Sequence, residues 1–189
     1  MTDYFKEKYL LFRAKNKDAE AFSKVYDLYA EKIYRYIFFK VRTEEDAQDL
    51  TSEVFLKTWQ YINESGKDVK NLNALFYKIA RNLVVDYYRK LSQQEVLLDQ
   101  EVLEKQQSLT SKKDLQDVES KIQMEKVEEK LKELKEEYRD AIILRYVEQL
   151  SIKEIAVILE KKSGAVRVIL YRALNVLKEL MEEKEDGKK

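Results

Sequence analysis

Apolar residues recur along this chain at intervals of three, four and seven positions, the spacing of one face of an α-helix. Runs that alternate apolar and polar residues, as half-buried strands do, are missing from the sequence. Proline is absent, and glycine occurs only at Gly66, Gly164 and Gly187, so little interrupts the helical pattern. We therefore predict an all-α fold.

Three helices are predicted in the N-terminal half. The first begins near Asp18, and its apolar stripe consists of Phe22, Val25, Tyr26, Tyr29, Ile33, Tyr36 and Ile37. The second follows Thr43, which can cap it with Asp46 at the capping-box position. The third spans about 71–91. We expect these helices to form one compact domain over residues 1–91.

The composition changes after this domain. Residues 92–124 are rich in Gln, Ser and acidic side chains and contain no aromatic residue, which is typical of a flexible linker. A second small domain is expected over 125–181, followed by a charged tail at 182–189. Its first helix is predicted to begin near Met124 and to continue to about Leu144.

Two capped helices follow in this second domain. Ser151 and Glu154 have the spacing of a capping box before a short helix. Ser163 can cap a final helix that runs from Gly164 to about Met181. A short helix, a turn and a second helix predict a helix-turn-helix.

Several functional classes are excluded by what the chain lacks. It has no His and no Cys, so a zinc finger, a Cys or His nucleophile and a Ser-His-Asp triad are impossible. Its glycines are too scattered for a phosphate-binding loop. It has no apolar run near 18 residues, and residues 1–8 lack a signal-peptide pattern. We predict a cytoplasmic, non-enzymatic protein with no cofactor, no metal and no membrane insertion.

Charge is balanced overall but segregated along the chain. The 36 basic and 36 acidic residues give a formal net charge of zero. Residues 44–53 hold five acids and no base, and residues 161–178 hold five bases and no acid. Residues 67–90 are mainly basic. Any single run is typical of a solvated face, but three runs on successive predicted elements favour binding surfaces.

Each of these elements has two interpretations. The final helix can enter a DNA groove, since small residues at its start permit close approach and Arg can bind guanine or phosphate; it can also be an ordinary helix with a basic rim. The basic third helix suits single-stranded nucleic acid or simple packing. The acidic helix has large residues off its apolar stripe, which suit a protein-binding surface, although Phe55 and Trp59 would equally suit the core.

Three segments, taken in order, resemble the extracytoplasmic-function (ECF) sigma factors of the sigma-70 family. Residues 46–59 (DAQDLTSEVFLKTW) resemble the polymerase-binding motif of region 2. Residues 79–90 (IARNLVVDYYRK) resemble the following helix, which meets the −10 element. Residues 138–156 with 164–174 resemble region 4, which binds the −35 element. The resemblance covers about 18–90 and 125–181 and implies two small helical domains.

The resemblance also implies a role for each surface. The residues expected to dock on the coiled coil of the polymerase β′ subunit are Asp46, Asp49, Glu53, Phe55, Leu56 and Trp59. Those expected near the melted −10 strand, with the loop 63–73, are Asn71, Asn73, Lys78, Arg81, Asn82, Asp86, Arg89 and Lys90. Those expected to meet the −35 duplex are Lys162, Ser163, Gly164, Arg167, Val168, Tyr171 and Arg172. The polymerase β flap and an anti-sigma factor are further expected partners.

The chain departs from the family pattern at several positions. In the final helix, Ala165, Val168 and Ile169 replace the commoner Thr, Ser and Arg, which removes hydrogen-bonding groups. Ser52 stands where Gln is usual, Leu75 where Trp is frequent, and Lys135 where region 4 usually begins with Pro. Val168 can therefore contact a thymine methyl group or be buried. A stand-alone helix-turn-helix regulator and a protein-binding helical adaptor remain the alternative functions.

Overall fold

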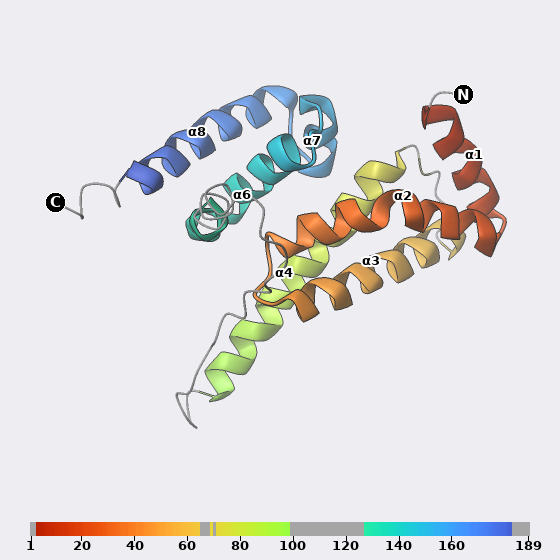
Figure 1. The fold of residues 1–189 in the computed structure, drawn as a ribbon, viewed down its shortest axis with the longest axis horizontal. Helices are drawn as coiled ribbons and strands as arrows, with labels where there is room; N and C mark the ends of the chain where they lie inside the picture. The colour runs from red at the N-terminus through yellow and green to blue at the C-terminus, as the bar shows by residue number, and fades with distance from the viewer. Residues whose placement is uncertain (1–2, 65–68, 70, 99–126, 183–189) are drawn as a thin grey trace, which may run out of the picture. The chain divides into compact units, whose positions relative to one another are not determined.

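A computed structural model of the chain describes residues 3–64, 69, 71–98 and 127–182. All regular elements in these ranges are helices, which confirms the all-α prediction (Figure 1). The chain divides into two compact units, Met1–Ser108 and Leu109–Lys189. Parts of three expected segments lie outside the described residues: the linker from residue 99 onward, residues 65–68 and 70 of the −10 loop, and the tail at 183–189.

The N-terminal unit is built from four helices, α1 (Asp3–Lys15), α2 (Ala19–Phe38), α3 (Glu44–Glu64) and α4 (Leu72–Leu98). The helix α2 packs against α1, α3 and α4, and α3 packs against α4 (Figure 1). The pattern of the sequence did not predict α1, whose apolar residues are concentrated at its C-terminal end. There Leu10, Leu11 and Ala14 are buried, so tertiary packing rather than a continuous apolar stripe supports this helix.

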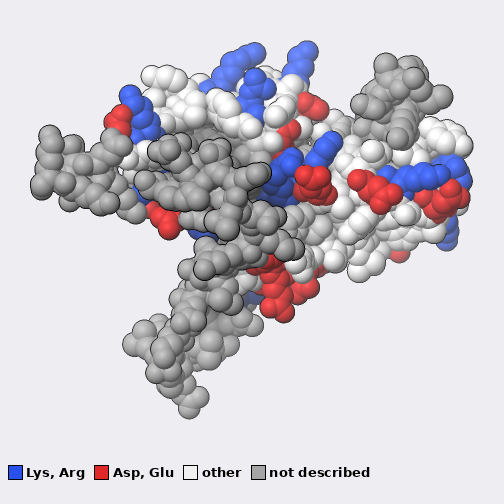
Figure 2. All heavy atoms as spheres, in the orientation of Figure 1, with Lys and Arg blue, Asp and Glu red and all other residues white. Residues whose placement is uncertain are grey.

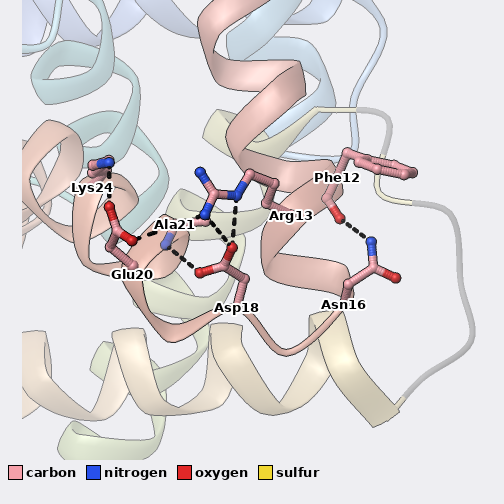
Figure 3. Close-up of polar contacts among 7 residues, drawn as sticks. All are labelled: Phe12, Arg13, Asn16, Asp18, Glu20, Ala21 and Lys24. Atoms are coloured by element: carbon pink, nitrogen blue, oxygen red, sulfur yellow. Dashed lines mark hydrogen bonds and ion pairs between the residues drawn. The ribbon is translucent and has the colours of Figure 1, made fainter.

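The helix α2 begins after Asp18, as the sequence predicts, and Asp18 also joins it to α1 (Figure 3). Its carboxylate accepts a hydrogen bond from the Ala21 backbone N–H at 3.0 Å and one from the Arg13 guanidinium at 2.6 Å. The backbone hydrogen bond and the cation both favour the charged carboxylate, and they lower the pKa of Asp18 below its ordinary value. Beside it Lys24 pairs with Glu20 at 2.7 Å, on the exposed side of α2.

Aromatic rings make up much of the N-terminal core. Tyr29 stacks on Phe76 with ring centroids 4.8 Å apart, and Phe76 also contacts Phe55 at 4.9 Å. Most of the predicted α2 stripe is buried, but Tyr26 is 46% exposed although its ring packs against Phe55 at 4.5 Å. The predicted cap of α3 is confirmed: the Asp46 N–H donates to Thr43 Oγ1 at 3.1 Å.

The helix α4 is longer than the pattern predicts. It was expected to end near Leu91, yet it continues to Leu98 and runs past the ends of α2 and α3 (Figure 1). No proline or glycine occurs between Leu72 and Leu98 to stop it. The expected linker, 92–124, therefore begins inside a helix.

The C-terminal unit contains helical residues 127–133, α6 (Glu136–Ile142), a π-helical turn η1 (Ile143–Val147), α7 (Ile152–Ile158) and α8 (Ser163–Glu182). In it α8 packs against both α6 and α7.

The single helix expected from Met124 to Leu144 is wrong, because the chain breaks at residues 134–135. The side chain of Arg139 stabilises this break by donating hydrogen bonds to the carbonyls of Leu131 at 2.8 Å and Leu134 at 3.3 Å. The carbonyl of Leu131 also accepts a backbone hydrogen bond from the Leu134 N–H at 3.3 Å, so Arg139 adds to the contacts at the end of this helical segment.

The helix-turn-helix has the predicted order, with one shift. The capping box before α7 is confirmed, since Ser151 Oγ accepts from the Glu154 N–H at 3.3 Å and Glu154 Oε2 accepts from the Ser151 N–H at 2.8 Å. The predicted cap of the last helix is wrong: α8 already begins at Ser163, so its N-cap position falls on Lys162, whose carbonyl accepts from the Val166 N–H at 3.1 Å.

Glu160, in the turn before α8, has a positive φ of 56°. This left-handed conformation costs an L-residue with a Cβ about 1–2 kcal/mol, whereas glycine adopts it readily. We expect Glu160→Gly to raise the free energy of unfolding by about 1 kcal/mol, measured by urea denaturation. Glu160→Ala removes the same side chain but keeps the Cβ, so it should not stabilise the protein. Equal effects of both substitutions would contradict this explanation.

Candidate binding surfaces

The outward face of α8 is the most regular surface of the C-terminal unit. Val166, Ile169, Leu170 and Ala173 turn its other side into the core. Opposite them, four exposed residues follow helical spacing at steps of four, three and four: Gly164, Val168, Tyr171 and Asn175. Tyr171 is 69% exposed and Val168 is 47% exposed. We call these four residues the outward ridge of α8.

Basic side chains lie along this ridge. Arg167 follows one side of it and Arg172 the other, and both are exposed. Figure 2 shows Lys and Arg side chains gathered over the end of α8 that lies beside α7. Lys161, in the preceding turn, instead pairs with Glu137 at 2.7 Å and so joins the turn to α6.

The structure brings together the residues predicted to meet the −35 duplex. Lys162, Gly164, Arg167, Val168, Tyr171 and Arg172 are all exposed at the turn and along the first half of α8, whereas Ser163 is half-buried. The sequence interpretation missed Asn175, which continues the outward ridge. Its spacing of four residues from Tyr171 is the signal that could have found it.

A second surface lies on α3. Asp49 and Leu56 are exposed and seven residues apart, so they lie on the same outward face of the helix. Leu56 is 56% exposed, so most of its apolar side chain faces solvent. Glu53 lies half-buried between them and pairs with Lys57 at 3.2 Å. The exposed Ser52 and Gln60 lie on this face too; no feature of the residues themselves had singled them out.

The prediction that Phe55 lies on this exposed face is wrong. Its side chain is only 4% exposed and its ring contacts Tyr26 at 4.5 Å and Phe76 at 4.9 Å. Trp59 is neither fully in the core nor fully exposed. It is half-buried, and its ring packs edge-on against Phe22 with centroids 4.8 Å apart. The exposed face of α3 therefore consists of a leucine beside carboxylates, with an aromatic edge.

Asp46 acts inside the N-terminal unit. Its carboxylate accepts hydrogen bonds from the Thr43 hydroxyl at 2.6 Å and from the Tyr87 hydroxyl of α4 at 2.8 Å. Burial, followed by the neighbouring carboxylate, raises the pKa of Tyr87 above its ordinary value, so that its hydroxyl stays protonated and donates. Asp46 thus joins the start of α3 to α4 through its Oδ2, which accepts both hydrogen bonds.

A third surface runs along α4. Lys78, Asn82, Asp86 and Arg89 are spaced at four, four and three residues and so share one face of the helix. Asp86 and Arg89 pair at 2.9 Å. This face presents positive charge and an amide group next to each other, which suits contacts to nucleic-acid phosphates and bases.

The other residues predicted for this surface lie elsewhere. Asn71 caps α4, since its side-chain oxygen accepts from the Ala74 N–H at 2.9 Å. Asn73 and Arg81 fall outside this face by helical spacing. Burial does not separate them from it, because Lys78 and Asp86 on the face are half-buried too. Lys90 lines a groove between α3 and α4 that Glu53 and Tyr87 also line. The structure therefore gathers four of the eight predicted residues on one face.

No helix in the part of the chain that the structure describes is both long and apolar enough to cross a membrane.

Two family profiles match the chain. The family described as Sigma-70 region 2 matches residues 25–94, and the family described as Sigma-70, region 4 matches residues 124–177. These two matches cover the units that carry the surfaces described above.

Curated relatives are similar over most of the chain. The ECF RNA polymerase sigma factor BldN of Streptomyces coelicolor is 30% identical over 172 residues, which are 91% of this chain and 64% of BldN. The chain thus spans less than two thirds of that relative. The ECF RNA polymerase sigma factor SigW of Bacillus subtilis is 27% identical over 180 residues, covering 90% of this chain and 94% of SigW.

Two solved structures have a similar fold. CnrH, in complex with the cytosolic domain of CnrY, matches with a TM-score of 0.72 and 17% identity over 94% of this chain and 98% of CnrH. RpoE, in complex with the anti-sigma factor NepR from Bartonella quintana, matches with a TM-score of 0.68 and 22% identity over 87% of this chain and 98% of RpoE.

Proposed function

The chain belongs to the sigma-70 family, as an RNA polymerase sigma factor of the ECF type, and from this premise we propose how its three surfaces divide promoter recognition between them. The two family matches account for both units, whereas a stand-alone regulator or a protein-binding adaptor would not explain the match to Sigma-70 region 2.

The observation that carries the proposal is the outward ridge of α8. A helix that enters the major groove needs a surface whose centre approaches the bases and whose flanks meet the phosphates. Gly164, Val168 and Tyr171 supply the centre, and Arg167 and Arg172 supply the flanks. We assign this surface to the duplex −35 element.

The face of α3 is the proposed contact with core polymerase. An exposed leucine beside carboxylates provides an apolar anchor next to charged groups, and the edge of Trp59 adds an aromatic group of the kind enriched in hot spots. Asp49, Glu53 and Leu56, with the edge of Trp59, are assigned to the coiled coil of the β′ subunit. Phe55 and Asp46 are assigned to the fold instead, because their contacts lie inside the unit.

The α4 face is assigned to the −10 element. Lys78, Asn82 and Arg89 can hold the backbone and edges of an unpaired strand, and the duplex opens most easily where unstacking costs least. The chemistry of RNA synthesis then belongs to the core enzyme, and this chain contributes binding energy. We also propose a cytoplasmic location and, as further partners, the β flap and an anti-sigma factor, the kind of protein with which RpoE was solved.

The direct test is transcription in vitro with bacterial core polymerase, the purified chain and a library of promoter sequences. We expect initiation at a defined set of sites that share two elements, with no additional factor. A chain that binds DNA but supports no initiation would favour the regulator, and one that binds neither DNA nor core polymerase would contradict the proposed function.

A further inference from the structure

The centre of the outward ridge of α8 is apolar. Val168 is 47% exposed there, while its neighbour Ile169 is buried. The two open possibilities for Val168 are thereby decided: its side chain faces solvent. Exposing a valine costs hydrophobic free energy unless a ligand covers it.

Gly164 lies one turn before Val168 on the same ridge, and the fold of this chain does not require a glycine there. A Cβ placed on Gly164 meets no atom within 4 Å. Glycine in a helix is less favourable than alanine, because it loses more backbone freedom on folding. Bare backbone at this position therefore suits the close approach of something outside the chain.

The flanks of the ridge indicate what approaches. Arg167 and Arg172 lie on either side of Val168, and no acidic residue occurs between Lys161 and Lys178. Such a surface fits an anion with an apolar group at its centre. In the major groove of DNA that group is the C5 methyl of thymine, which lies between two rows of phosphates.

We propose that Val168 reads a thymine methyl group in the −35 element, and that Gly164 allows the helix backbone to come close enough for this contact. Sequence discrimination at this position then comes from an apolar contact rather than a hydrogen bond. The inference rests on the proposed function, since it requires α8 to lie in the major groove of the −35 duplex.

The test uses holoenzyme reconstituted from core polymerase and the full chain, with promoter duplexes from the transcription experiment. Each −35 thymine on either strand is replaced in turn by deoxyuridine, which lacks only the methyl group. We expect one replacement to weaken binding by about fourfold, the factor expected for one buried methyl group. In holoenzyme with Val168→Ala this replacement should have no effect.

A matched control is Val157→Ala in α7, a valine that is 49% exposed and lies off the ridge. This variant should keep the full deoxyuridine effect. Two results would contradict the thymine contact even if promoter binding is specific. In one, each deoxyuridine replacement lowers the affinity of Val168→Ala and wild-type holoenzyme by the same factor. In the other, no replacement changes the affinity. Equal binding of promoter and scrambled −35 duplexes would instead overturn the proposed function itself.

Gly164→Ala tests the second half of the proposal. The added methyl group has open space in the free protein, so the thermal unfolding midpoint should stay the same or rise. Binding of the holoenzyme to the −35 duplex should nevertheless weaken several-fold, because the methyl group separates the helix from the bases. Unchanged promoter affinity would show that the backbone does not come close at Gly164.

Discussion

Phe55→Ala is expected to lower the free energy of unfolding by about 3–5 kcal/mol, the usual cost of removing a buried phenylalanine ring. Phe55 is 4% exposed and contacts Tyr26 and Phe76, so its removal leaves a cavity between α2, α3 and α4. Leu56→Ala, at the next residue, should change this free energy by less than about 0.5 kcal/mol, because the leucine side chain is mostly in solvent. Urea denaturation of both variants measures the difference.

The same two variants separate folding from docking. Leu56→Ala should weaken binding to core polymerase by about 2 kcal/mol, or about thirtyfold, if Leu56 is an anchor of the interface. This loss of affinity must occur while the chain is folded, so the helical content of the sample used for binding is measured as well. Gln60→Ala, an exposed residue of the same face, is a milder comparison. Full affinity of folded Leu56→Ala for core polymerase would remove α3 from the docking assignment.

The neighbours Phe55 and Leu56 also show how much of side-chain burial the sequence pattern predicts. Each step along a helix turns the side-chain direction by about 100°, so Leu56 falls opposite the stripe of Leu50 and Val54. Phe55 falls near the edge of that stripe, where the width of the buried face decides whether its side chain is buried or exposed. That width depends on whether α2 and α4 cover the edge, which is a tertiary property that the local pattern does not contain.

Elements with local causes were predicted well. Asp18, Thr43 and Ser151 begin helices through hydrogen bonds within three residues, and such contacts are visible in the sequence. The break at residues 134–135 is different, because Arg139 stabilises it from the following helix. The sequence there has neither proline nor glycine to mark an end. The missed helix α1 likewise depends on contacts with α2 and α3.

The candidate surfaces were also predictable to different degrees, depending on whether the local pattern or tertiary packing decides which residues are exposed. The outward ridge of α8 is the complement of a strongly apolar stripe, so Gly164 and Tyr171 were found from the sequence, whereas Asn175 was missed and Val168 was left open. On α4 the apolar residues extend around more of the helix, since Ala74, Phe76 and Tyr77 are all buried. Positions that looked solvent-facing there, such as Arg81, are half-buried. Residues with capping or pairing roles, such as Asn71 and Asp46, could be separated from binding residues only with the structure.

Arg167→Ala is expected to weaken binding of the holoenzyme to promoter DNA by about 1–3 kcal/mol if the guanidinium contacts a base edge. Arg167 is exposed at the flank of the outward ridge, and its substitution leaves the buried residues of α8 untouched. Lys178→Ala is the matched control: it also removes a positive charge from α8, but about 16 Å further along the helix, where Lys178 pairs with Glu182 at 3.6 Å. Its effect on promoter binding should be small.

Salt dependence and sequence dependence together assign the contact that Arg167 makes. A base contact makes the loss larger on the cognate −35 element than on a scrambled one, because guanine offers two acceptors that other bases do not. A phosphate contact weakens both duplexes equally and reduces the slope of log affinity against log salt concentration by about one. Arg172, on the other flank, allows the same comparison. If α8 enters the groove by this face, the guanidinium beside the ridge must contact either a base or a phosphate. Arg167→Ala with no effect on either duplex would therefore mean that α8 does not bind DNA by this face.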